Sequence, residues 1–296
     1  MLKEQFSDIL DKIAVGCVGA GSENFGFDDE ISRDHDFEPS FYIFLPDEST
    51  VSRREEFLLE RAYYKLPREY MGLKRSIVNP VGGARCGVIR TADFYLKKVG
   101  KADGNLSIYD WLTLPSYSLA EATNGNLFFD NLGEFTKIRN RLLDMPEDIR
   151  KKRLAGNLLL MAQSGTYNYE RCLSHNETGG AQLSVIEFVK STMQVIFLLN
   201  CRYMPFYKWS FKALKNLDIL GNTAADLEWL ISIDNSAENQ NNKIQIIDNL
   251  SNLIIKELKN QELTKAVCID LEKHAYSVND LILNEEIRNL NIFTAV

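Results

Sequence analysis

The pattern of apolar residues along the sequence changes near residue 134, and this change limits the folds that the chain can adopt. Before it, short apolar runs alternate with glycine-containing breaks, which is typical of strands and turns mixed with helices. After it, apolar residues recur every three or four positions over long stretches, which is typical of amphipathic helices. A chain of 296 residues is also long for a single hydrophobic core. We therefore predict an α+β protein in which a small mixed sheet flanked by helices precedes a C-terminal helical bundle.

The expected boundary between these two regions lies at residues 131–146, which divides the chain into domains of residues 1–140 and 141–296. In the first domain we expect helices at 2–13 and 53–65, and strands at 14–18, 76–81 and 86–91. An extended region interrupted by Pro39 is expected over 33–37 and 40–45. In the second domain we expect helices at 148–163, 181–200, 208–218, 223–233, 242–259 and 277–289.

The composition is that of an ordinary folded protein, with 45% hydrophobic and 25% charged residues. No apolar stretch approaches the roughly 18 consecutive residues that cross a bilayer, and the first residues lack the basic flank and apolar core of a signal peptide. We therefore expect no membrane association and a cytoplasmic location. The five cysteines are scattered without a Cys-x-x-Cys pair, so we expect them to be reduced and not to bind zinc.

The net charge of −7 disfavours a large surface for nucleic acid, because such surfaces neutralise phosphates with basic residues. One local exception is the pair of basic segments at 137–141 and 150–153. These segments are candidates for contact with an anionic ligand. On the pattern alone, a solvated helix face is the favoured interpretation.

The segment most informative about chemistry begins where the first apolar strand ends. Gly19-Ala20-Gly21-Ser22 forms the break, and Asp34-His35-Asp36 follows twelve residues after the serine. A P-loop is excluded because no Gly-Lys-Ser/Thr follows the glycines, and a dinucleotide fingerprint is excluded because Asn24 stands where its third glycine belongs. A glycine turn followed by an Asp-x-Asp pair remains.

In an extended strand the side chains alternate between faces, so Asp34 and Asp36 are expected on one side and His35 on the other. Two neighbouring carboxylates repel one another unless a cation lies between them, and hard oxygen ligands of this kind suit Mg²⁺. The turn at Gly21 and Ser22 can present backbone N–H groups at a helix N-terminus, which attracts phosphate oxygens. The pattern therefore predicts a site for Mg²⁺ and a polyphosphate.

This combination resembles the signature of nucleotidyltransferases of the DNA-polymerase-beta superfamily, in which an apolar strand ends in Gly-Ser and a following strand carries Asp-x-Asp. It also resembles a family of bacterial nucleotidyltransferase-like proteins that is described mainly as a domain of unknown function. The C-terminal part of that family is helical and similar to the substrate domain of aminoglycoside nucleotidyltransferases. The resemblance covers roughly residues 14–215 and depends on Gly21–Asp36, Asp110-Trp111-Leu112, Phe129-Asp130 with Gly133, Gln163-x-Gly165-x-Tyr167-Asn168, Leu199-Asn200, Tyr203-x-Pro205 and Lys208-Trp209. Its most specific element is Ser32-Arg33-Asp34-His35-Asp36.

The resemblance implies that Asp34 and Asp36 are catalytic and hold Mg²⁺, with two ions expected, and that Gly21 and Ser22 bind a nucleoside triphosphate, for which ATP is favoured. Lys208 is a further candidate for binding phosphate. One departure concerns the third carboxylate that this superfamily places on a neighbouring strand. The strand expected there, residues 87–91, has none, and the nearby candidates are Asp93, Glu121 and Asp130.

The predicted reaction transfers a nucleoside monophosphate from the triphosphate to a hydroxyl group of an acceptor, which is a small molecule or a macromolecule. Two alternatives stay open: a non-catalytic nucleotide-binding or regulatory module, and an enzyme that modifies RNA ends through the basic segments. A nucleic-acid acceptor is not favoured, and the sequence does not indicate the oligomeric state. A polar group at Gln163, Tyr167, Asn168 and Arg171 shares one helix face if the helix continues through Gly165, and is either a ligand-contacting surface or a polar seam between domains.

Overall fold

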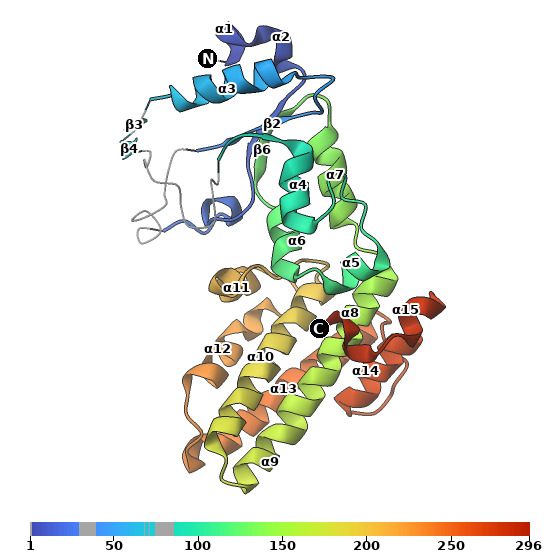
Figure 1. Cartoon of the computed structure of the whole chain (residues 1–296). Coiled ribbons are helices and arrows are strands. Elements are labelled where there is room, and N and C mark those ends of the chain that lie inside the picture. Colours follow the sequence, from blue (N-terminus) through green and yellow to red (C-terminus); the bar gives the residue numbers. More distant parts are fainter. Residues whose placement is uncertain (1, 30–39, 68, 71, 75–85) are drawn as a thin grey trace. The chain divides into compact units, whose positions relative to one another are not determined.

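The computed structural model describes residues 2–29, 40–67, 69–70, 72–74 and 86–296 (Figure 1). Helices dominate, and a small mixed sheet lies in the first half of the chain, so the predicted α+β class is confirmed. The chain divides into two compact units. Unit 1 contains Met1–Leu106 and Tyr117–Asp144, and unit 2 contains Ser107–Ser116 and Met145–Val296.

Unit 1 is built on a four-stranded sheet with the strand order β5-β2-β1-β6. The strands are β1 (Ala14–Cys17), β2 (Tyr42–Leu45), β5 (Gly87–Arg90) and β6 (Asn126–Asp130). β1 runs antiparallel to β2 and β6, whereas β2 runs parallel to β5. Consequently, the C-terminal end of β1 lies at the same edge of the sheet as the N-terminal ends of the other three strands. A separate two-stranded sheet joins β3 (Glu69–Tyr70) to β4 (Leu73–Lys74).

Alternation along β2 explains why helices cover both faces of this sheet. Ile43 and Leu45 are buried in a cluster with Leu59 and Tyr63 of α3 (Arg53–Tyr64). Phe44 faces the other way, and its ring centroid lies 4.4 Å from that of Phe135. Phe135 belongs to α7 (Glu134–Leu143), which packs on that face together with α4 (Thr91–Val99), as Figure 1 shows.

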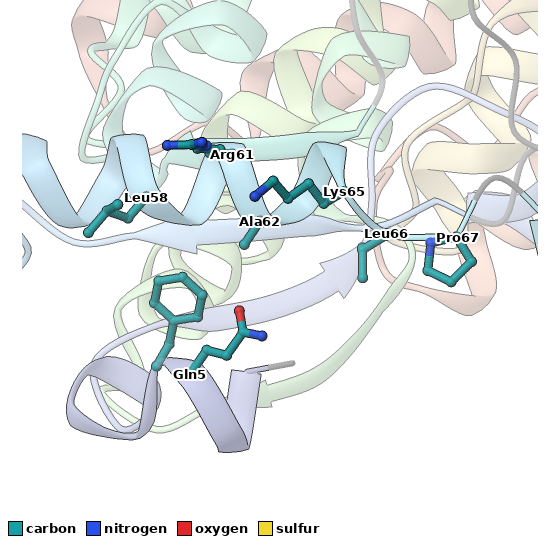
Figure 2. A pocket seen from close by; sticks show the side chains of 8 residues that line it. Gln5, Leu58, Arg61, Ala62, Lys65, Leu66 and Pro67 are labelled. Atoms are coloured by element: carbon teal, nitrogen blue, oxygen red, sulfur yellow. The ribbon is translucent and has the colours of Figure 1, made fainter.

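The N-terminal helix expected over residues 2–13 is two short helices, α1 (Leu2–Gln5) and α2 (Ser7–Leu10). The break lies at Phe6, whose φ of −136° and ψ of 32° are not helical. Between these helices and the C-terminal half of α3 lies a hollow of about 690 Å³ (Figure 2). The strands expected at 33–37 and 76–81 fall outside the described residues, while the strand expected at 86–91 is confirmed as β5.

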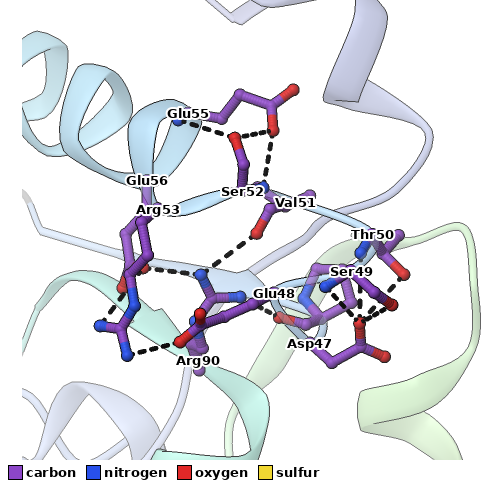
Figure 3. Close-up of polar contacts among 11 residues, drawn as sticks. Asp47, Glu48, Ser49, Thr50, Val51, Ser52, Arg53, Glu55, Glu56 and Arg90 are labelled. Atoms are coloured by element: carbon purple, nitrogen blue, oxygen red, sulfur yellow. Dashed lines mark hydrogen bonds and ion pairs between the residues drawn. The ribbon is translucent and has the colours of Figure 1, made fainter.

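Two sets of side-chain contacts stabilise the N-terminal part of α3 and the loop before it. Ser52 and Glu55 form a reciprocal capping box, which satisfies two backbone N–H groups that have no partner within the helix. Arg90, at the end of β5, donates hydrogen bonds to the carbonyl oxygens of Pro46 (2.6 Å) and Val51 (3.1 Å), and to the Glu56 carboxylate at 2.7 Å (Figure 3). A single buried guanidinium thereby ties the sheet to the loop that precedes α3.

Unit 2 is helical throughout. Its helices are α5 (Ile108–Thr113), α8 (Glu147–Met161), α9 (Tyr169–Ser174), α10 (Thr178–Leu199), α11 (Tyr207–Leu214), α12 (Ala224–Ser232), α13 (Ala237–Asn260), α14 (Leu271–Asp280) and α15 (Glu285–Asn289). The helix α6 (Ser116–Thr123) belongs to unit 1 apart from its first residue. Five of the six helices predicted for this region are confirmed, but the one expected over 277–289 is wrong, because the chain leaves the helix after Asp280 and restarts at Glu285.

Among the described residues, α10 alone is long and apolar enough to cross a membrane, with a mean hydropathy of 1.3 over its most apolar window. Two thirds of that window (67%) is buried within the protein, where α10 packs against α8, α9 and α12. The side chains of Val185, Phe188 and Val195 are fully buried there. We therefore assign α10 as a core helix.

Unit 2 also buries cations that the sequence pattern does not mark as buried. The ammonium group of Lys152 donates to Asn279 Oδ1 (2.8 Å), the Leu290 carbonyl (2.7 Å) and the Arg288 carbonyl (3.2 Å). Arg153 donates to the carbonyl oxygens of Trp111 and Leu114. Burial lowers the pKa of both side chains. These cations satisfy carbonyl groups at helix ends and attach α15 and residues 107–116 to α8.

Candidate functional site

The break predicted after the first strand is a glycine turn at the C-terminal end of β1. Gly19 and Gly21 adopt φ angles of 103° and 122°, a region that side-chain-bearing residues rarely occupy. A single 3₁₀ turn, Glu23–Phe25, follows, and the Ser22 carbonyl accepts hydrogen bonds from the N–H groups of Phe25 and Phe27, both at 3.0 Å. The tight turn is therefore confirmed. The helix expected to begin at Ser22 is only this one turn, because the left-handed Gly26 ends it.

Two residues distant in sequence hold this turn in place. The Asn124 side chain accepts a hydrogen bond from the Gly19 N–H and donates one to the Gly19 carbonyl, both at 2.8 Å. Lys98, near the end of α4, pairs with Glu121 at 2.5 Å. Its Nζ lies 3.9 Å from the position that a Cβ atom on Gly19 would occupy. An ammonium group therefore stands directly beside the turn.

The side chains that follow the turn give it a polar lining. The Glu23 carboxylate folds back against Gly21, although Glu23 as a residue is exposed. Asn24 is only 7% exposed and donates to the Ala20 carbonyl at 2.9 Å. Its Oδ1 atom is buried and accepts no hydrogen bond from any described group. Buried amide oxygens usually have a donor, so this one is available to a ligand or an ordered water.

Ser40 and the start of β2 lie beside the end of β1. The β1–β2 register pairs Gly16 with Tyr42, and the Cys17 thiol donates a hydrogen bond to the Ser40 carbonyl at 3.2 Å. Burial raises the pKa of the Cys17 thiol, and the nearby Glu23 carboxylate raises it further. Ser40 therefore adjoins the end of β1, from which the glycine turn departs.

The predicted metal ligands Asp34 and Asp36 lie outside the described residues. Among residues that the structure does describe, there is no cluster of three or more His, Cys, Asp or Glu side chains of the kind that binds a metal. The assignment of these two aspartates to Mg²⁺ stays a prediction from the sequence.

The three candidates for the third carboxylate differ in position. Asp130 pairs with Ala14, and Asp93 lies in the first turn of α4 after β5, so both are at the opposite end of the sheet from the glycine turn. Glu121 alone is at the turn, through its ion pair with Lys98.

Lys208, the other predicted phosphate ligand, belongs to unit 2, whereas the glycine turn belongs to unit 1. It lies in the first turn of α11 and is exposed. Its Nζ is 5.0 Å from the centroid of the Trp209 ring, a cation–π distance. Phosphate binding by Lys208 stays a prediction from the sequence.

The polar group expected on one helix face lies in unit 2, on a segment with π-helical geometry, Ala162–Asn168. Gln163, Tyr167 and Asn168 are exposed. The Arg171 guanidinium donates to the Tyr167 hydroxyl at 2.8 Å. The helical segment continues through Gly165. A Cβ at this position would lie 2.4 Å from the Phe188 ring, so only glycine lets α10 pack this closely.

Most side chains of the basic segments at 137–141 and 150–153 have partners within their own unit. Within unit 1, Arg139 donates to the Asn124 carbonyl and Arg141 to the Asp103 carbonyl. Within unit 2, Arg150 pairs with Glu147, and Lys152 and Arg153 are buried. The sequence pattern does not indicate these contacts, because the carbonyl partners of Arg139, Arg141 and Arg153 lie far from them along the chain.

Comparison with known proteins adds one similarity. A family model described as a domain of unknown function, DUF4037, matches residues 111–210. No curated protein and no solved structure matches the chain. The matched region runs from α5 to α11 and does not include the glycine turn or the two aspartates.

Proposed function

We propose that the protein transfers a nucleoside monophosphate from a nucleoside triphosphate, with ATP favoured, to a hydroxyl group of an acceptor in the cytoplasm. The observation that carries this proposal is the glycine turn at the end of β1, with an ammonium group beside it and with Ser40 at the same strand end. In the reaction, the acceptor oxygen forms a bond to the α-phosphorus while the bond to pyrophosphate breaks. The hydroxyl proton passes to a base.

The turn binds the triphosphate through its backbone. Gly21 has no side chain and a left-handed φ, so phosphate oxygens can approach the N–H groups closely. The Glu23 carboxylate lies against Gly21, and two negative groups in contact repel one another. Because Glu23 is exposed, its side chain can swing into solvent when the polyphosphate binds.

Lys98 supplies positive charge that the turn itself lacks. Glu121 fixes its ammonium group beside Gly19, which orients the cation before the ligand arrives. A prepositioned cation stabilises the charge on the leaving pyrophosphate without a reorganisation cost. We therefore assign phosphate binding to Gly21, Ser22 and Lys98, and keep Lys208 as a proposal that rests on the sequence.

Asp34 and Asp36 supply the donor set for the metal. Their carboxylates are the hard oxygen ligands that Mg²⁺ prefers, and two such groups leave coordination positions for phosphate oxygens. Bound Mg²⁺ would neutralise charge that develops as the pyrophosphate bond breaks.

One observation favours a second candidate function, nucleotide binding without transfer. Of the three candidates for the third carboxylate, only Glu121 lies at the turn, and it is paired with Lys98. A site that binds the triphosphate but lacks a base for the acceptor hydroxyl would act as a sensor or regulatory module. The third alternative, an enzyme that modifies RNA ends, receives less support, because most cations of the two basic segments already have partners in the protein.

The test is a transfer assay with triphosphates labelled at the α-phosphate, Mg²⁺ and a broad screen of acceptors, in which pyrophosphate release is measured in parallel. We expect label in a product, release of pyrophosphate in equal amount, and loss of both when a chelator removes the metal. Binding of the triphosphate by calorimetry without any labelled product would favour the regulatory module. Absence of both binding and transfer would exclude each of the two candidates.

A further inference from the structure

The outer side of α3 carries a set of exposed side chains that the proposed reaction does not use. We call it the α3 basic face, and its members are Arg54, Phe57, Leu58, Arg61, Tyr64 and Lys65. At 3.6 residues per turn these positions fall on one side of the helix, opposite the buried Leu59 and Tyr63. Phe57 and Tyr64 are 61% and 78% exposed, which is unusual for aromatic side chains of this size.

The charge of this face is of one sign. Arg54, Arg61 and Lys65 are exposed, and none of them forms an ion pair with any part of the chain that the structure describes. Two of the three acidic residues of α3 have partners outside this face: Glu55 bonds to Ser52 in the capping box and Glu56 bonds to Arg90. The third, Glu60, is half-buried and lies next to Tyr64 at the edge of the face. Three cations spread over about 16 Å of helix therefore have no acidic partner in the described part of the chain, although the overall charge of the protein is −7.

The hollow beside this face gives it depth. Its volume is about 690 Å³, within the range of sites that enclose a small molecule or one flat group of a larger one. Arg61 and Lys65 supply its charge, and Gln5 supplies an amide that can both donate and accept hydrogen bonds. In Figure 2, Leu58 and Ala62 point from α3 toward Gln5, and Leu66 and Pro67 lie at the end of the helix. The lining contains no carboxylate.

The order of side chains distinguishes between anionic partners. A helix that lies on a membrane has an apolar centre to insert and cations along its margins. The α3 basic face has the reverse order, with Arg54, Arg61 and Lys65 in the middle and Phe57 and Tyr64 along one edge. A row of cations with exposed aromatic rings beside it can hold single-stranded nucleic acid, with phosphates on the cations and bases on the rings.

We propose that the α3 basic face binds single-stranded RNA, with phosphates on Arg54, Arg61 and Lys65, bases stacked on Phe57 and Tyr64, and one nucleotide in the adjoining hollow. RNA is chosen over DNA because cellular RNA exposes unpaired bases in loops and ends, whereas most DNA is paired. The inference concerns binding alone and goes beyond the proposed nucleotidyl transfer, which does not depend on it.

The placement of α3 also fits this role. The Tyr63 hydroxyl donates to the Phe41 carbonyl at 2.9 Å, which holds the C-terminal end of α3 against the start of β2. That end of β2 is the edge of the sheet from which the glycine turn departs. A strand of RNA that follows the face from Arg54 to Lys65 therefore runs toward the edge of unit 1 that carries the turn.

The test measures fluorescence anisotropy of a short labelled oligouridylate RNA with the full-length protein over a series of salt concentrations. Oligouridylate is used because its bases are largely unstacked and free to bind. We expect the double variant Arg61→Ala/Lys65→Ala to lower the slope of log affinity against log salt by about 1.4, which is about 0.7 for each lost phosphate contact. Phe57→Ala and Tyr64→Ala should each weaken binding about tenfold with little change in slope.

The matched control is Lys256→Ala/Lys273→Ala, which removes the same charge from exposed positions of unit 2. Its salt slope should equal that of the unchanged protein, and thermal unfolding of every variant should confirm that it is folded. Equal effects of the control and α3 variants would overturn the proposal, as would absence of RNA binding. Equal affinity for duplex RNA would overturn the stacking of bases. Binding to vesicles of phosphatidylcholine and phosphatidylserine in place of RNA would assign the face to a membrane.

Discussion

The two units differ in whether their buried polar groups have hydrogen-bond partners. In unit 2 the buried ammonium groups of Lys152 and Lys243 each donate to three oxygen acceptors, so the polar atoms at their heads are satisfied. In unit 1 the buried Asn24 Oδ1 has no described donor and lies next to a turn in which Gly19 and Gly21 have positive φ angles. Unsatisfied groups cost stability, and structures retain them where a ligand completes them. We infer a division of labour in which unit 2 contributes stability and unit 1 carries the proposed nucleotide site.

The largest effect on stability is expected in the core of unit 2. Phe188 of α10 is fully buried, and Phe188→Ala removes its ring and leaves a cavity. We expect the free energy of unfolding to fall by about 4 kcal/mol. Urea unfolding measures this loss, and calorimetry below the transition should show unchanged binding of triphosphate.

The control for that substitution is Ile186→Ala on the same helix, since Ile186 is 39% exposed and should cost much less. If Phe188→Ala abolished nucleotide binding in protein that is still folded, the division of labour between the units would be wrong.

The largest effect on activity is expected in unit 1. Asp34→Asn or Asp36→Asn removes a charge from the proposed metal site, and turnover should fall by about 10²- to 10³-fold, as when other preorganised electrostatic groups are removed. The unfolding midpoint should stay nearly the same, which separates this effect from that of Phe188→Ala. Asp28→Asn, an exposed neighbour in sequence, is the control and should retain activity. Equal activity in all three purified variants would remove both aspartates from the mechanism.

Part of this structure could be predicted from the sequence because the relevant signals are local. Apolar periodicity predicts α8, α10, α12 and α13, and the glycines predict the turn after β1. Turn chemistry needs only neighbouring residues, so Gly19 and Gly21 could be assigned to positions that favour glycine. The element boundaries were less predictable, since the breaks at Phe6 and after Asp280 have no proline or glycine to mark them.

The parts that could not be predicted depend on contacts between residues far apart in the chain. Asn124 clamps Gly19 across 105 positions, and Lys98 reaches the turn only because α4 runs back along the sheet from β5. Lys152 and Arg153 belong to a basic run that predicts exposure, yet both are buried on carbonyl groups. No local sequence pattern indicated that residues 107–116 belong to unit 2.

The contribution of Lys98 gives a smaller test of the site. Lys98→Ala removes the ammonium group beside Gly19, and we expect affinity for the triphosphate to fall about tenfold, or about 1.4 kcal/mol, which is typical of one charged hydrogen bond. Lys97→Ala, an exposed neighbour on α4, is the matched control. Calorimetry with Mg²⁺ measures both variants. Identical affinities would show that Lys98 serves only to pair with Glu121.

The smallest effect concerns the pH dependence of unit 2. Burial raises the pKa of Tyr169 to about 12, above the value of about 10 in an unfolded chain. A raised folded pKa contributes stability that is complete below pH 10 and is lost as the pH rises toward 12. Between about pH 9 and about pH 11 this loss amounts to about 1 kcal/mol.

Urea unfolding of the unchanged protein and of Tyr169→Phe at these two pH values isolates the contribution of the phenol. The variant should lose about 1 kcal/mol less than the unchanged protein over the interval. Parallel pH profiles for the two proteins would show that the Tyr169 hydroxyl is not held in its neutral form by the fold.

The most direct measurement is a crystal structure with a non-hydrolysable triphosphate and Mg²⁺. We predict phosphate oxygens on the backbone of Gly21 and Ser22, the Lys98 ammonium within hydrogen-bond distance of them, and metal ions between the phosphates and the carboxylates of Asp34 and Asp36. Carboxylates that point away from each other, or a triphosphate bound elsewhere in the protein, would contradict the proposed function.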